Sequence, residues 1–131
     1  MKPCVLIPCY NHAATVGEVA RAARAHCSVI VVDDGSTEQL PELSGCDLVR
    51  LPSNRGKAAA LRAGFQRAVE LGFTHVITMD ADGQHFAEDL PKFLTAAQAW
   101  FLTLALRQTI DVALRFQEDP ELLTPPGRGL Y

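Results

Sequence analysis

Short apolar runs that alternate with helical stretches constrain the fold of this chain more than any other feature. The runs are too short for helices and rich in Val, Ile and Leu, and they lie at residues 5–7, 28–32, 47–51 and 75–79. Residues 13–26 and 57–71 are Ala-rich and carry apolar side chains at helical spacing, which predicts two helices. Strands that alternate with helices favour βαβ units, so we expect an α/β domain with a parallel, right-handed, Rossmann-like sheet.

Composition excludes several other classes of protein. The 131 residues are enough for one core but not for two, and a net charge of −3 is not typical of a nucleic-acid-binding protein. The apolar run at 96–106 is too short to span a bilayer. The sequence has no C-x-x-C pair that would suggest a zinc or redox site. Scattered thiols without a signal peptide are typical of a reducing cytoplasm. These thiols, which we expect to be small core residues, are Cys4, Cys9, Cys27 and Cys46.

The stretch H-V-I-T-M-D-A-D-G-Q-H at residues 75–85 carries the strongest chemical signal. An apolar strand leads directly into Asp80 and Asp82, and in extended backbone residues i and i+2 project to the same side. Two close carboxylates repel each other unless a cation or proton lies between them. Mg²⁺ suits one or two carboxylates completed by water or phosphate, and open α/β folds bind ligands at the carboxyl ends of their strands. This combination indicates a metal–phosphate site.

The acidic cluster Asp33-Asp34-Gly35-Ser36 follows the second predicted strand and has two interpretations. It is either a strand-to-helix turn, with an Asx turn and Gly at positive φ, or a group that holds a nucleotide base or ribose. Tyr10 likewise either fills the core or stacks on a base.

Arg55 and Lys57 stand where the second predicted helix begins. Lone basic residues at such a place usually form only a solvated helix start. Beside a metal–diphosphate site, however, they are placed to balance phosphate charge at a helix N-terminus.

Two competing motifs fail on inspection. The P-loop pattern has a glycine where this chain has Leu51, and Ser or Thr where it has Ala58. An EF-hand that starts at Asp80 needs Gly and Glu where the chain has His85 and Pro91.

A third motif stays open as a weaker alternative. The sequence D-A-D-G at residues 80–83 resembles the D-x-D-G nucleophile motif of haloacid-dehalogenase-type phosphatases, in which the first Asp attacks phosphorus. In those enzymes the motif normally lies on the first strand and continues with Thr or Val, whereas here it follows the fourth strand and continues with Gln84.

Taken together, four clusters in the right order resemble the family 2 glycosyltransferases of the GT-A fold, especially dolichol- or polyprenol-phosphate sugar transferases. They are I-P-C-Y-N at 7–11, V-V-D-D-G-S-T at 31–37, N-R-G-K at 54–57 and D-A-D-G-Q at 80–84. The resemblance covers roughly residues 3–97. It implies a nucleotide-sugar-binding half whose mostly parallel sheet has the strand order 3-2-1-4 and is flanked by helices.

The resemblance also implies a mechanism and a set of site residues. A bound Mg²⁺ or Mn²⁺ stabilises the leaving nucleoside diphosphate while an acceptor hydroxyl or polyprenyl phosphate attacks the anomeric carbon, with inversion. The implied metal ligands are Asp80, Asp82 and Gln84. The residues implied to bind the nucleotide of the sugar donor are Pro8, Tyr10, Asn11, Asp33, Asp34, Gly35, Lys57 and Asp80.

The C-terminal third departs from the family pattern. We expect a truncated nucleotide-sugar-binding domain at residues 1–98, followed at 99–131 by an atypical helical segment, to about residue 116, and a Pro- and Gly-rich tail. No acceptor-side base is found, so a non-catalytic donor-binding remnant and a frameshifted or shortened reading of a longer gene stay open. Truncation leaves the fourth strand as a bare sheet edge, which the C-terminal helix or a partner chain is expected to cover. A polyprenyl-phosphate acceptor implies that this protein, which we expect in the cytoplasm, works at a membrane face.

Overall fold

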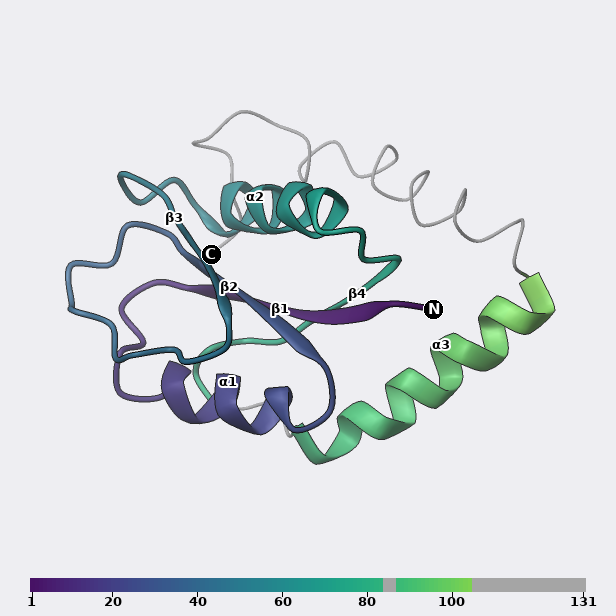
Figure 1. The fold of residues 1–131 in the computed structure, drawn as a ribbon. Helices are drawn as coiled ribbons and strands as arrows, with labels where there is room; N and C mark the ends of the chain where they lie inside the picture. The colour runs from purple at the N-terminus through teal and green to yellow at the C-terminus, as the bar shows by residue number, and fades with distance from the viewer. Residues whose placement is uncertain (84–86, 105–131) are drawn as a thin grey trace.

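A computed structural model describes residues 1–83 and 87–104 as one α/β unit (Figure 1). Its four-stranded sheet is parallel and has the order β3-β2-β1-β4. The strands are β1 (Pro3–Cys9), β2 (Ser28–Asp33), β3 (Asp47–Arg50) and β4 (His75–Thr78). The helices are α1 (Val16–Arg24), α2 (Lys57–Glu70), the short 3₁₀ helix η1 (Ala87–Asp89) and α3 (Leu90–Leu104). The predicted fold class and strand order are therefore confirmed.

Helices α1 and α2 cover opposite faces of the sheet (Figure 1). Successive residues of a strand point to opposite faces, so β1 contributes to two separate cores. Val5 and Ile7 pack with the α1 side, whereas Leu6 packs with the α2 side, and all three are fully buried. This burial on both faces explains why β1 is an unbroken apolar run rather than an alternating one.

Two side-chain contacts fix α2 against the sheet. Arg67 makes a two-pronged pair with Asp47 of β3, with Nε–Oδ1 at 2.8 Å and Nη2–Oδ2 at 2.9 Å. The hydrogen bonds from Arg67 lower the pKa of the Asp47 carboxyl. At Gly64 an added methyl group would overlap the buried Leu6 side chain, so glycine permits the close approach of α2 to β1.

Strand β1 does not end before Pro8, where the apolar run was expected to stop. It continues to Cys9, whose carbonyl accepts a hydrogen bond from Asp34 N of the chain leaving β2 at 2.8 Å. Successive residues of β1 direct their backbone N–H and C=O groups to opposite neighbouring strands. Cys9 bonds to the β2 side, so the backbone nitrogen of Pro8 faces the β4 side. The β1–β4 register ends at Leu6 and Thr78, and the missing N–H at Pro8 therefore removes no ladder bond.

Helix α3 leaves the sheet and extends away from it at the lower right of Figure 1. Its first residue, Leu90, is buried in the α1-side core, but residues 90–104 make no extended contact with β4. The expected cover of the β4 edge is therefore not supplied by this part of the helix, and residues 105–116 lie outside the described ranges. The helix runs unbroken across residue 98, and the predicted division into 1–98 and 99–131 stays a prediction.

No helix among residues 1–83 and 87–104 is both long and apolar enough to cross a membrane. The four cysteines are free thiols: Cys4 and Cys9 are buried in the cores, while Cys27 and Cys46 are partly buried beside them. Burial raises the pKa of each thiol, which agrees with their prediction as small core residues.

Candidate functional site

The predicted site residues gather at one edge of the sheet, because all four parallel strands end there. Four segments meet at this edge: the chain after β1, the chain after β2, the start of α2, and the chain after β4. Each is joined to the next by hydrogen bonds between residues far apart in sequence. Each of these contacts between two segments is called a junction below.

Asn11 joins the chain after β1 to the chain after β2. Its backbone N–H donates to Ser36 Oγ at 3.0 Å, and its side-chain Oδ1 accepts from Thr37 N at 2.9 Å. Asn11 adopts a left-handed backbone with φ of 55°, which asparagine tolerates better than most residues. The side-chain oxygen of Asn11 is thus occupied by a loop-to-loop contact.

Asp33 and Gly35 form the turn that the sequence allowed as one interpretation of the acidic cluster. Asp33 Oδ1 accepts a hydrogen bond from Ser36 N at 2.9 Å, and Gly35 has φ of +71°. Arg50 Nε of β3 lies 3.7 Å from Asp33 Oδ2. A methyl group on Gly35 would overlap the backbone of Ser53 and Asn54, so the turn is pressed against the loop before α2.

Asp34 joins that turn to the start of α2. Its side chain is fully buried, Oδ1 accepts from Arg55 N at 2.8 Å, and Oδ2 accepts from Gly56 N at 3.0 Å. Two charge-assisted bonds to backbone N–H groups offset the cost of burying this carboxylate. Asp34 thus fixes the position of the loop before α2.

Lys57 joins α2 to the chain after β4. Its Nζ lies 3.0 Å from Asp80 Oδ1, and both side chains are only partly buried. Neither a helix pattern nor a strand pattern predicts this pair, because the two residues are neighbours only in the folded chain.

The backbone around Asp82 differs from the expected geometry. Strand β4 ends at Thr78 rather than at residue 79, and Ala81 and Asp82 lie in a turn. The extended-strand argument, that residues i and i+2 point to one side, therefore does not apply to Asp80 and Asp82. Asp82 is half-buried, and Gly83 follows with φ of +81°.

Thr15 closes the set of junctions and was not predicted as a site residue. Its Oγ1 donates to the carbonyl oxygen of Ala81 at 2.6 Å, across 66 positions of sequence. A threonine just before an apolar helical pattern is a recognisable helix-start signal, but that signal does not identify a partner on another element. Together the junctions tie all four segments into a closed ring.

The donor set at this edge suits a hard cation that takes most of its ligands from phosphate and water. Asp80 and Asp82 supply carboxylate oxygens, the ligand type that Mg²⁺ and Mn²⁺ prefer. Within the described ranges, no group of three or more His, Cys, Asp or Glu side chains could hold a metal by itself. The third predicted ligand, Gln84, lies outside these ranges.

Pro8 and Tyr10 flank the same edge, and both are half-buried. Pro8 lies on β1 and Tyr10 directly after it, and part of each side chain is accessible, as a surface for a flat base requires.

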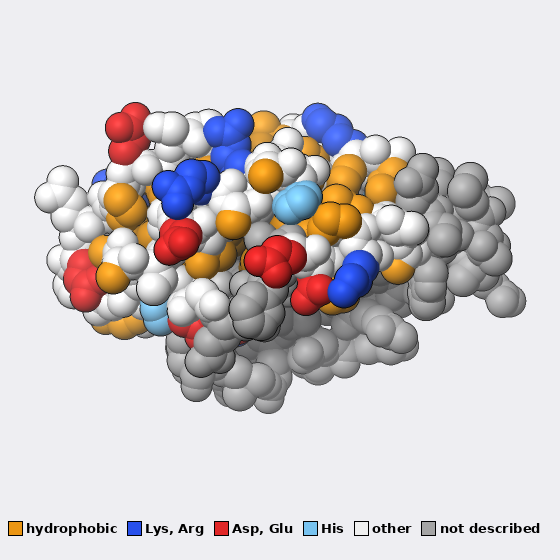
Figure 2. Space-filling view, turned by 90° about the horizontal axis from the view of Figure 1, so that it is seen from below, with side chains coloured by type: hydrophobic (Ala, Val, Ile, Leu, Met, Phe, Trp, Pro, Cys, Tyr) orange, Lys and Arg blue, Asp and Glu red, His pale blue; other side chains and the backbone are white. Residues whose placement is uncertain are grey.

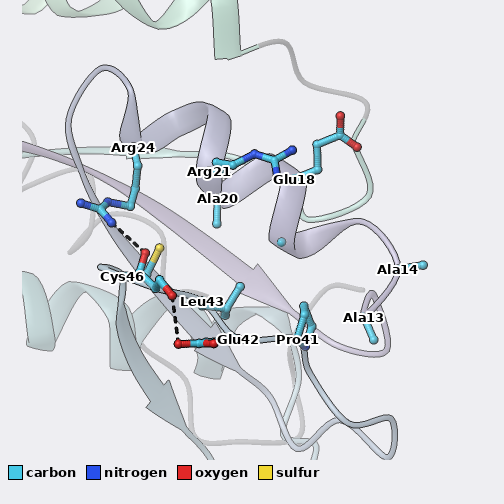
Figure 3. Close-up of a pocket in the computed structure, with 12 residues that line it drawn as sticks. Ala13, Ala14, Glu18, Ala20, Arg21, Arg24, Pro41, Glu42, Leu43 and Cys46 are labelled. Carbon is cyan, nitrogen blue, oxygen red and sulfur yellow. Dashed lines mark hydrogen bonds between the residues drawn. The ribbon is translucent and has the colours of Figure 1, made fainter.

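A hollow of about 470 Å³ lies elsewhere, between α1 and the segment at residues 41–46 (Figure 3). Arg24 crosses it to donate to the Ser44 carbonyl at 2.7 Å, and Ser44 Oγ donates to Glu42 Oε1 at 3.0 Å. None of the predicted site residues lines this hollow.

On the face seen in Figure 2, acidic and basic side chains are interspersed. The described part of this face carries no continuous basic patch.

The family model for glycosyl transferase family 2 matches residues 4–121. Undecaprenyl-phosphate 4-deoxy-4-formamido-L-arabinose transferase from Pseudomonas paraeruginosa is 34% identical over 120 residues, which covers 79% of this chain and 34% of that protein. Polyprenol monophosphomannose synthase from Mycolicibacterium smegmatis is 33% identical over 107 residues, which covers 72% and 40%. The chain thus spans less than half the length of either relative.

Among solved structures, glucosyl-3-phosphoglycerate synthase from Mycobacterium tuberculosis, in complex with Mn²⁺, UDP and glucosyl-3-phosphoglycerate, is 22% identical with a TM-score of 0.48. The likeness covers 61% of this chain and 33% of that one.

Proposed function

Because this chain belongs to glycosyl transferase family 2, we propose that it forms the nucleotide-sugar donor site of a metal-dependent, inverting glycosyltransferase. The family match confirms the resemblance to family 2 glycosyltransferases that the four sequence motifs indicated. The donor, the metal and the acceptor are proposals for this chain, which spans less than half of the relatives named above.

The observation that carries the proposal is the pairing of Lys57 with Asp80 at 3.0 Å, with Asp82 two residues further on. A cation paired with one carboxylate, with a second carboxylate two residues further along at the carboxyl end of parallel strands, gives both signs of charge that a metal–diphosphate group needs. Asp82, which is half-buried two residues after Asp80, is the second proposed carboxylate ligand.

We assign the base and ribose of the donor to the β1 side of this edge. Tyr10 and Pro8 offer partly accessible ring surfaces, and Asn11, Asp33 and Gly35 hold the two loops that frame them. Asp34 stands behind this surface and fixes the loop at residues 54–56. The shape of this proposed binding surface therefore depends on Asp34 even though its side chain is buried.

We assign the diphosphate to the β4 side. Asp80 and Asp82, with Gln84, are the proposed ligands of Mg²⁺ or Mn²⁺, and Lys57 at the first turn of α2 faces the phosphates. When bound, such a metal acts as a Lewis acid for the departing nucleoside diphosphate. The chain itself supplies charge and orientation.

The acceptor proposal rests on the names of the relatives. Two of them are named for undecaprenyl-phosphate and polyprenol phosphate chemistry, so we propose a polyprenyl phosphate acceptor at a membrane face. Co-sedimentation with vesicles that contain polyprenyl phosphate, compared with plain vesicles, measures this. Equal sedimentation with both would contradict it.

Calorimetric titration with UDP-, GDP- and TDP-sugars, in Mn²⁺ and in EDTA, tests the donor site. We expect binding of one nucleotide class in Mn²⁺, lost in EDTA and in Asp82→Asn, and retained in Glu18→Gln. Glu18 is a matched control because it is an exposed acid on α1, outside the proposed site.

A folded wild-type chain that binds none of these sugars would contradict the proposal. Release of inorganic phosphate from small phosphoesters, abolished by Asp80→Asn, would instead favour the D-x-D-G phosphatase alternative.

A further inference from the structure

Thr15 stands at the N-cap position of α1 but does not cap the helix. Its side chain makes no capping hydrogen bond to the first turn, although this is the usual role of threonine at such a position. The hydroxyl is directed instead toward the chain that leaves β4. The hydroxyl therefore makes a long-range hydrogen bond to Ala81 in place of the local capping bond.

The distances identify the acceptor that dominates. Thr15 Oγ1 lies 2.6 Å from the Ala81 carbonyl oxygen and 3.4 Å from the His12 carbonyl oxygen. A hydroxyl carries one proton, and 2.6 Å is at the short end of the O–H···O range. The hydroxyl of Thr15 thus donates its proton to the Ala81 carbonyl oxygen.

Ala81 is the residue between the two proposed metal ligands, and it is held from two sides. Its side chain is 2% exposed and packs in the same core as Val16 and Leu90. Its carbonyl is fixed by Thr15. With both its methyl group and its carbonyl fixed, Ala81 limits how the flanking backbone of Asp80 and Asp82 can rotate.

We propose that Thr15 is a positioning residue, whose hydroxyl sets the orientation of the Asp80–Asp82 turn toward the metal and diphosphate by holding the Ala81 carbonyl. This inference rests on the proposed function for the identity of the ligand. Its structural part, the immobilisation of the turn, does not. The first turn of α1, which is packed against the sheet by the fully buried Val16, serves as the fixed support.

Two substitutions at Thr15 separate the hydroxyl from the shape of the side chain. Thr15→Val keeps the branched shape and removes the donor, whereas Thr15→Ser keeps the donor. Thr95→Val is the matched control, because Thr95 Oγ1 also donates to a backbone carbonyl, that of Pro91 at 2.8 Å on α3.

The first readout is amide hydrogen exchange in the segment at residues 80–83, which needs no ligand. We expect several-fold faster exchange in Thr15→Val than in the wild type, with wild-type rates in Thr15→Ser and in Thr95→Val. Unchanged exchange in Thr15→Val would overturn the positioning role.

The second readout is the Mn²⁺-dependent part of nucleotide-sugar affinity. We expect Thr15→Val to weaken it about tenfold, as the loss of one strong hydrogen bond implies, and Thr15→Ser to restore it. Equal losses in Thr15→Val and Thr15→Ser would overturn the assignment to the hydroxyl. Failure of the wild type to bind would instead overturn the proposed function, while the exchange rates still report on Thr15.

Discussion

The carboxylate of Asp34 accepts a hydrogen bond at 3.0 Å from the backbone N–H of Gly56, a residue 22 positions further along the chain. Its other oxygen accepts from the neighbouring Arg55 N–H. One buried side chain thus determines where the loop before α2 lies relative to the end of β2. We therefore expect this contact to affect both the stability of the domain and the shape of the proposed site.

Asp34→Asn should lower the free energy of unfolding by about 1.5–3 kcal/mol, because one of the two backbone N–H groups loses its acceptor altogether and the other keeps only a neutral one. Urea denaturation measures the change. Asp80→Asn is the control: its ion pair with Lys57 is partly exposed, so a change of about 1 kcal/mol or less is expected. Similar losses in the two variants would contradict a special role for Asp34.

Gly35→Ala should destabilise the domain more than Gly72→Ala does. Both glycines have similar positive φ, +71° and +78°, so both substitutions carry the same kind of backbone strain. Only at Gly35 would the new methyl group overlap the backbone of Ser53 and Asn54; at Gly72 the nearest atom is Lys2 Nζ at 3.9 Å. Thermal unfolding of the two variants compares them directly. Equal melting temperatures would show that the loop before α2 moves aside without penalty.

Lys57→Met should weaken binding of nucleotide sugars about tenfold or more and change stability little, because the pair with Asp80 is partly exposed. Lys92→Met is the matched control: Lys92 Nζ pairs with Asp89 Oδ1 at 2.9 Å, away from the ring of loops. Calorimetric titration distinguishes the two. A Lys57→Met chain with wild-type affinity would remove the phosphate role assigned to this lysine.

Alkaline pH should unfold the domain partly through Cys4. Burial raises the pKa of its thiol from the ordinary 9.0 to about 12, so the native state keeps the thiol neutral while the unfolded chain ionises it. The stability that this provides is present below pH 9 and is lost as the pH rises from 9 through 12. Unfolding free energies measured across this range should fall less steeply in Cys4→Ala. Parallel pH profiles in the two proteins would contradict this assignment.

The elements of the fold could be predicted from local pattern. Residues 28–32 are β-branched and apolar, and residues 57–71 have helical spacing, and the structure places β2 at Ser28–Asp33 and α2 at Lys57–Glu70. The ends of a strand could not be predicted from local pattern where a neighbouring strand sets them. Pro8 lies inside β1 because β4 has already left that side of the strand, which no local pattern records.

Sequence alone determined that this chain forms a parallel α/β sheet and that acidic and basic clusters follow its strands, because hydrophobic periodicity and residue type are local properties. Only the tertiary structure decided which of these groups face each other. The pairs of Asp34 with Gly56, Lys57 with Asp80, and Thr15 with Ala81 join residues that are 22, 23 and 66 positions apart. Such contacts depend on how helices pack against a sheet and on where strand pairing ends, and these are properties of the assembled core.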